Sequence, residues 1–196
     1  MRARVILMVS SVLLTACVPA IPTTSQATVE PVPLVTPAVP QGASFYDGCT
    51  HMLSYPSELE TRDGILFQSP SYQDVSLLII ARRRAEGEET LALEALASQV
   101  AARWSTRANG PVFEPLQVTD YLGTTFDGLR SDLVDEAGTH TRLMVVVRPE
   151  TLLGDMLPAD VVYEIMAQAP EAVWPEWNPL FEIVFQTFHP KDCGGV

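Results

Sequence analysis

Positive charge is scarce in this sequence. Lysine and arginine together number 12 against 24 aspartates and glutamates, the formal net charge is −12, and Lys191 is the only lysine. A strongly acidic surface repels nucleic acid and anionic lipid headgroups. The composition therefore argues against a nucleic-acid partner.

Long apolar runs are also missing. The N-terminal run from Val5 to Leu14 is broken only by two serines. It is shorter than the roughly 20 apolar residues that a transmembrane helix needs. Two arginines precede the run and two small residues follow it, which is the order of a secretory signal. We therefore predict a signal peptide over residues 1–16.

The signal ends in Leu14-Thr15-Ala16-Cys17, which looks like a bacterial lipobox. Cleavage before Cys17 would leave a cysteine whose sulfur forms a thioether to lipid, with palmitate as an expected acyl group. One acyl chain holds a protein only marginally, whereas two or more hold it stably. The sequence thus predicts a lipid anchor in the cell membrane, with the folded part on its extracytoplasmic side. The alternative is an ordinary signal peptide with Cys17 merely near its end.

Cysteine is rare as well, and only Cys49 and Cys193 remain once Cys17 carries lipid. Two remaining thiols in an exported protein most simply form one disulfide. The alternatives are two free or buried thiols, or a metal pair, although a metal site would want further ligands at close spacing. We predict a disulfide between Cys49 and Cys193.

The segment that follows Cys17 is rich in proline, threonine, valine and alanine, and its only charge is Glu30. Proline at this density does not build a helix or a central strand. We predict that residues 17–43 form a lipidated, disordered tether that lifts the domain off the membrane. Residues 44–196 are then the globular domain.

Alternating and continuous apolar runs predict strands over 51–55, 64–68, 75–81, 114–121, 124–134 and 139–148. Residues 161–169 fit either a strand or a helix. An apolar stripe predicts a long helix over 88–108. A second helix would begin with Asn178 as its cap and Pro179 in its first position. Together these features predict an α+β fold, an antiparallel-rich sheet of about six strands packed by a long central helix and a C-terminal helix.

This order of elements resembles the PsbP-like fold, which photosystem II extrinsic proteins share with a nuclear import factor and many bacterial envelope lipoproteins. The resemblance extends over roughly residues 46–188. It depends on the strand end Tyr55-Pro56 and on a C-terminal helix that carries Trp177, Phe181 and Thr187-Phe188. The chain departs from the family at Tyr46-Asp47-Gly48-Cys49, where a Tyr-Gly-Phe type of opening is common. The resemblance implies a sandwich fold. It transfers no activity and no binding residue to this chain.

Residues with catalytic or metal-binding spacing are absent from the sequence. The three histidines, His51, His140 and His189, stand apart from one another, and no nucleophile elbow, phosphate-binding loop or dinucleotide motif occurs. The acids around Asp135 match no calcium loop. Arg82-Arg83-Arg84 is explained by nearby glutamates better than by a phosphate site. We therefore assign no catalytic, metal or cofactor-binding residue.

Three functional hypotheses remain open. The first is a non-enzymatic envelope lipoprotein, anchored to the membrane through lipid on Cys17, that acts by contact with an unknown envelope protein or small ligand. The second is a carrier of a small apolar ligand, with a cavity lined by residues such as Trp104 and Phe181. The third is a hydrolase whose histidine, acid and hydroxyl meet only in three dimensions.

Overall fold

The computed structural model describes residues 39–104, 111–149 and 160–191. The chain divides after Pro31 into two units, and all described residues belong to the second. Within the described residues, neither helix is long and apolar enough to cross a membrane. The predicted lipid-bearing cysteine and most of the predicted tether lie outside these ranges.

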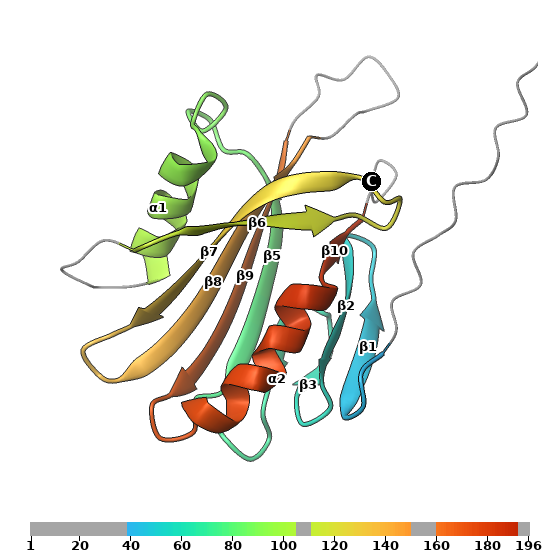
Figure 1. Cartoon of the computed structure of the whole chain (residues 1–196), viewed down its shortest axis with the longest axis vertical. Helices are drawn as coiled ribbons and strands as arrows, with labels where there is room; N and C mark the ends of the chain where they lie inside the picture. The colour runs from blue at the N-terminus through green and yellow to red at the C-terminus, as the bar shows by residue number, and fades with distance from the viewer. Residues whose placement is uncertain (1–38, 105–110, 150–159, 192–196) are drawn as a thin grey trace, which may run out of the picture. The chain divides into compact units, whose positions relative to one another are not determined.

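The described residues form two antiparallel sheets and two helices (Figure 1). The small sheet has the order β1-β2-β10, from Ala43–Asp47, His51–Pro56 and His189–Pro190. The large sheet has seven strands in the order β3-β4-β5-β9-β8-β7-β6. Its strands are Glu60–Thr61, Leu66–Gln68, Ser76–Arg83, Val161–Pro170, Thr139–Arg148, Thr125–Val134 and Glu114–Thr119. The α+β class and the antiparallel pairing agree with the prediction.

The prediction of about six strands in one sheet was wrong. Residues 161–170 form β9, which lies between β5 and β8 in the middle of the large sheet. The other additions are β1, β3 and β10, and β3 and β10 have two residues each. Strands this short carry no periodicity, so only their pairing with a neighbour reveals them. Hydrogen bonding also begins before residue 44, because Ser57 donates to the Gly42 carbonyl.

The first helix, α1, spans Leu93–Trp104 and does not include the predicted start at residue 88. Residues 85–91 instead form turns, in which the carboxylate of Glu88 accepts a hydrogen bond from the backbone N–H of Ala85. The apolar stripe is real, because Leu96, Ala97, Val100 and Ala101 are buried. The predicted end of the helix lies outside the described residues.

The second helix, α2, spans Trp174–Thr187, so the predicted cap at Asn178 was wrong. Pro175 occupies the first turn, where a missing N–H costs nothing, and Pro179 lies inside the helix. The aromatic stripe was predicted correctly. Trp177, Phe181, Val184 and Phe188 are all buried.

The large sheet has a hydrophobic core on each face. Alternate residues of β8 point to opposite faces. Met144 and Val146 pack with α2 and with the small sheet, whereas Leu143 and Val145 pack with α1. The two helices therefore cover opposite faces of the large sheet. We call these faces the α1 face and the α2 face.

Candidate functional site

The α1 face of the large sheet is covered over only part of its width. The buried side of α1 packs on β7, β8 and β9 through a cluster that includes Leu129, Val145 and Met166. Towards β4 the face opens, because Leu66 is 39% exposed and Leu78 and Ile80 are partly exposed. We call this uncovered part of the α1 face, over β3, β4 and β5, the open face.

A row of polar side chains crosses the α1 face at one level. Strand register places Glu60 opposite Gln68, Gln68 opposite Ser76, Ser76 opposite Gln168, and Gln168 opposite Thr141. Directly opposed residues of an antiparallel pair share a face. We call this set the polar row. A parallel row of apolar residues lies beside it, running from Leu66 through Leu78 and Met166 to Leu143.

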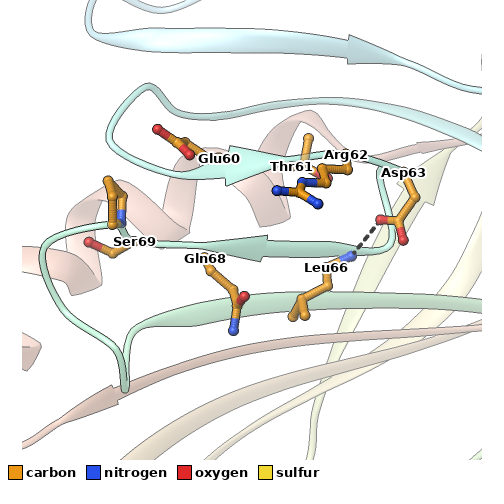
Figure 2. A pocket seen from close by; sticks show the side chains of 8 residues that line it. Glu60, Thr61, Arg62, Asp63, Leu66, Gln68 and Ser69 are labelled. Carbon is orange, nitrogen blue, oxygen red and sulfur yellow. Dashed lines mark hydrogen bonds between the residues drawn. The ribbon is translucent and has the colours of Figure 1, made fainter.

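A pocket of about 410 Å³ lies at the β3–β4 end of the polar row (Figure 2). In this view α2 lies behind the sheet, so the reader looks onto the α1 face. The volume falls in the range of small-molecule sites. The pocket is lined by Glu60, Thr61, Arg62, Asp63, Leu66, Gln68, Ser69 and Pro70.

The turn beside the pocket is fixed by hydrogen bonds from its own residues. The carboxylate of Asp63 accepts hydrogen bonds from the backbone N–H groups of Ile65 and Leu66, at 2.9 and 3.2 Å. These bonds lower the pKa of Asp63, so its side chain stays ionised. The hydroxyl of Thr61 accepts a bond from the N–H of Gly64 at 2.9 Å.

Two aromatic side chains of the small sheet hold the same turn from the α2 face. The hydroxyl of Tyr46 donates to the carbonyl of Asp63 at 3.1 Å, and the Nε2 of His51 lies 3.1 Å from the carbonyl of Gly64. His51 is only 3% exposed, and its burial lowers its pKa to about 4. The ring is therefore neutral near pH 7, and it fixes the turn that borders the pocket.

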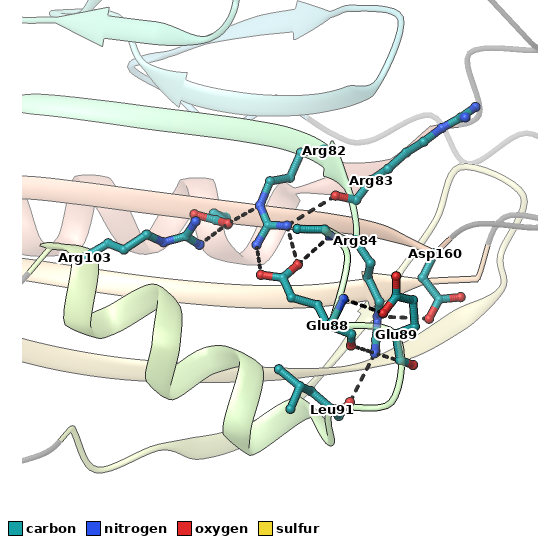
Figure 3. A network of polar contacts seen from close by, with 11 residues as sticks. Arg82, Arg83, Arg84, Glu88, Glu89, Leu91, Arg103 and Asp160 are labelled. Atoms are coloured by element: carbon teal, nitrogen blue, oxygen red, sulfur yellow. Dashed lines mark hydrogen bonds and ion pairs between the residues drawn. The ribbon is translucent and has the colours of Figure 1, made fainter.

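A partly buried ion-pair network borders the open face at its other end (Figure 3). Glu164, 3% exposed, accepts hydrogen bonds from Arg82 Nε at 2.7 Å and from Arg103 Nη2 at 2.6 Å. Arg82 also holds Glu88 through two bonds of 2.6 and 3.0 Å, which lower the pKa of Glu88. The predicted balance between the triple arginine and its glutamates is confirmed for Arg82.

The rest of the triple arginine has different surroundings. Arg84 donates to the carbonyls of Glu88, Glu89 and Leu91 and lies 3.1 Å from Asp160. Its guanidinium therefore holds the turns that lead into α1. Arg83 is exposed. The guanidinium groups of Arg82 and Arg84 are thus engaged by carboxylates and carbonyls of the chain itself, which explains these two arginines without a phosphate ligand.

The predicted site cysteines fall mostly outside the described residues. Cys17 and Cys193 are not among them, so lipid attachment and the Cys49–Cys193 pairing stay predictions. Cys49 itself is disulfide-bonded.

The three histidines lie in separate places. His140 contacts Glu171 and stacks on Trp174 with 4.8 Å between ring centroids. His189 Nδ1 lies 2.6 Å from the carbonyl of Thr119. His51 contacts a hydroxyl and a carbonyl. Within the described ranges, no histidine contacts an acid and a hydroxyl together, which is the arrangement that the hydrolase hypothesis requires.

The cavity considered for an apolar ligand does not form between Trp104 and Phe181. Phe181 is fully buried in the core of the α2 face, whereas Trp104 ends the helix on the opposite face and is 37% exposed. The large sheet separates the two side chains. This form of the carrier hypothesis was therefore wrong.

The acidic residues at the β7–β8 hairpin also serve local structure. Asp135 accepts bonds from the N–H groups of Ala137 and Thr139, and Asp132 holds Arg142 through two bonds of 2.7 and 2.8 Å. Among the residues that the structure describes, no group of three or more potential ligands could hold a metal ion.

Sequence reasoning missed the polar row. Its members come from five strands, and only the register of those strands brings them to one level. A usable signal was nevertheless present. Gln68 and Gln168 stand within apolar strands at positions where alternation would place an exposed side chain.

Comparison with known proteins gives similarity at the level of the fold. No protein-family model and no curated protein sequence matches the chain. The structure is similar to cyanobacterial PsbP (CyanoP) from Synechocystis sp. PCC 6803, with 16% identity, a TM-score of 0.44, and 82% of this chain and 99% of that chain covered. It is also similar to LpqN of Mycobacterium tuberculosis, described as involved in cell envelope biogenesis, with 11% identity, a TM-score of 0.47, and coverage of 72% and 83%. The first of these two structures is a PsbP protein, the kind of protein that the order of elements resembles.

Proposed function

We propose that this chain is a lipid-anchored protein of the cell envelope whose domain binds a ligand or another protein on its open face. The lipobox at Cys17 and the proline-rich tether support the anchor. Together they would place the domain on the extracytoplasmic side, at some distance from the membrane surface.

The observation that carries the binding role is the incomplete cover of the α1 face. One end of that face is closed by α1, whereas the other presents Leu66, Gln68 and a pocket of about 410 Å³. Exposed apolar side chains rimmed by polar ones are typical of binding surfaces. The fixed turn at Asp63 supports a preformed site, which lowers the entropic cost of binding.

The side chains on the open face favour binding over catalysis. They offer an amide, hydroxyls and charged groups for hydrogen bonding, together with leucines for packing. Such groups suit recognition, and a role as a binding protein uses all of them. We accordingly propose a non-enzymatic function.

Site-specific photo-crosslinking tests this proposal. We would introduce p-benzoylphenylalanine in place of Leu66 in the full-length protein, expressed in its own envelope. The control carries the same group in place of Gln186, which is exposed on α2. The proposal expects an adduct of defined mass at position 66 and not at position 186. The same pattern at both positions, or no adduct at position 66, would contradict it.

A further inference from the structure

We propose that the polar row binds an uncharged, hydroxyl-rich ligand, namely an oligosaccharide. This inference rests on the proposed binding function and names the ligand class for the same face. The members of the polar row lie at one level across five neighbouring strands, and they are Glu60, Gln68, Ser76, Gln168 and Thr141.

The exposed members of the row have hydrogen-bonding capacity to spare. Gln68 is exposed, Ser76 is partly exposed, and neither makes a side-chain hydrogen bond within the described part of the chain. Gln168 donates its Nε2 to the hydroxyl of Thr141 at 3.1 Å, which leaves its carbonyl oxygen as an acceptor. Amides and hydroxyls both donate and accept. Sugar hydroxyls do the same, so the two sets of groups match.

Charged groups at the pocket end strengthen this match and disfavour an anionic ligand. Glu60 and Asp63 line the pocket, Arg62 is the one basic residue among its lining residues, and the whole chain has a net charge of −12. Carboxylates accept hydrogen bonds from hydroxyls strongly. They repel phosphate and other acidic groups. The electrostatics therefore select a neutral polyol.

The apolar row beside the polar row suits a sugar ring. Leu66 and Leu78 are opposed across β4 and β5, and both are at least partly exposed. A saccharide presents hydroxyls at its edge and C–H groups on its ring faces. Such a ring can therefore pack against the leucines while its hydroxyls reach the polar row.

The length of the row indicates a chain of sugars. Neighbouring strands lie about 4.8 Å apart, so the four strands whose row members keep exposed surface spread the row over roughly 14 Å. The pocket of about 410 Å³ lies at one end and would hold one end of the ligand. An oligosaccharide running across the four strands β3, β4, β5 and β9 meets a polar side chain with exposed surface at each of them, whereas Thr141 on β8 is buried and serves to hold Gln168.

An array of neutral and acidic oligosaccharides, probed with the full-length protein, tests the inference. We expect binding to neutral oligosaccharides, and about a tenfold loss of affinity on combining Gln68→Ala with Ser76→Ala. Gln186→Ala removes an exposed amide from α2 and is the matched control, expected to bind as the unchanged protein does. Equal thermal melting of the variants would show that the loss is local.

Three outcomes would overturn the inference: no binding to any neutral oligosaccharide, binding to acidic ones only, or an equal loss from Gln186→Ala. The crosslinking experiment separates this failure from failure of the proposed function. A protein adduct at position 66 together with a silent array would leave the binding face in place and exclude the oligosaccharide. A silent array with no adduct would remove both.

Discussion

Arg103 Nη2 donates a hydrogen bond of 2.6 Å to Glu164 Oε1, and this contact joins the last turn of α1 to the centre of the large sheet. Glu164 is nearly inaccessible to water, whereas the Arg103 side chain is about half exposed. Arg82 approaches the same oxygen from β5. One carboxylate thus fixes the position of α1, which borders the open face.

Glu164→Gln should lower the free energy of unfolding by about 1–3 kcal/mol, because it removes the buried negative charge that pairs with two arginines. The loss stays moderate because Arg82 keeps Glu88 and Arg103 is hydrated. Urea denaturation measures it. Glu94→Gln removes an exposed carboxylate in the first turn of α1 and should change stability far less. Equal effects of the two substitutions would contradict this role for Glu164.

Gly64→Ala should be strongly destabilising. Gly64 has a φ of +71°, and an added Cβ would lie 1.9 Å from the ring of Tyr46. Backbone strain and overpacking together should cost about 3 kcal/mol. Gly87→Ala is the matched control, because its φ is +87° and nothing lies within 4 Å of the added Cβ. The melting temperature should fall much further for Gly64→Ala than for Gly87→Ala. Similar decreases in melting temperature would refute the close packing of Tyr46 against Gly64.

His51 should make the fold sensitive to mild acid. Its pKa falls from 6.5 to about 4 in the folded state because the ring is buried. The unfolded chain therefore takes up a proton first, and stability decreases as pH falls from about 6.5 to about 4, by about 3 kcal/mol in total. Below that range His51 contributes no further loss.

Urea denaturation at pH 7, 6 and 5 measures this dependence. The carboxylates of Asp63, Glu88, Asp132 and Asp135 contribute little in that window, because hydrogen bonds to each of them lower its pKa further below pH 5. In His51→Gln the free energy of unfolding should change less between pH 7 and pH 5, even though the substitution lowers stability at pH 7. An unchanged slope in this variant would rule His51 out as its source.

The strongly periodic parts of the fold could be predicted from the sequence. The buried stripes of α1 and α2 repeat at helical spacing, and β8 reads as a continuous apolar run. The ends of the helices were predicted less accurately. Asn178 and Pro179 look like a helix start, but tertiary packing of Trp174 and Trp177 extends α2 by another turn.

The candidate site was the least predictable part, for a physical reason. Gln68 and Gln168 are 100 residues apart in sequence. Strand register alone places both of them opposite Ser76, one on each side of it. The position of β9 in the centre of the sheet creates this arrangement, and the sequence left that segment open between strand and helix. A site made by register cannot be read from local spacing.

The predicted Cys49–Cys193 disulfide gives a further test. Non-reducing mass spectrometry of the protein isolated from the envelope should show the two cysteines joined in one peptide pair. Cys193→Ser should destabilise the domain by about 2–5 kcal/mol, since the bridge would close a long loop. Two thiols that alkylate without reductant would contradict the bridge.

The central claim is that lipid on Cys17 holds this protein at a membrane. Metabolic labelling with an alkyne analogue of palmitate, followed by fractionation, tests it most directly in the unchanged protein and in Cys17→Ser. We predict label and membrane retention in the unchanged protein, and neither in the variant. An unlabelled protein, or a Cys17→Ser variant that stays as firmly in the membrane fraction, would contradict the account.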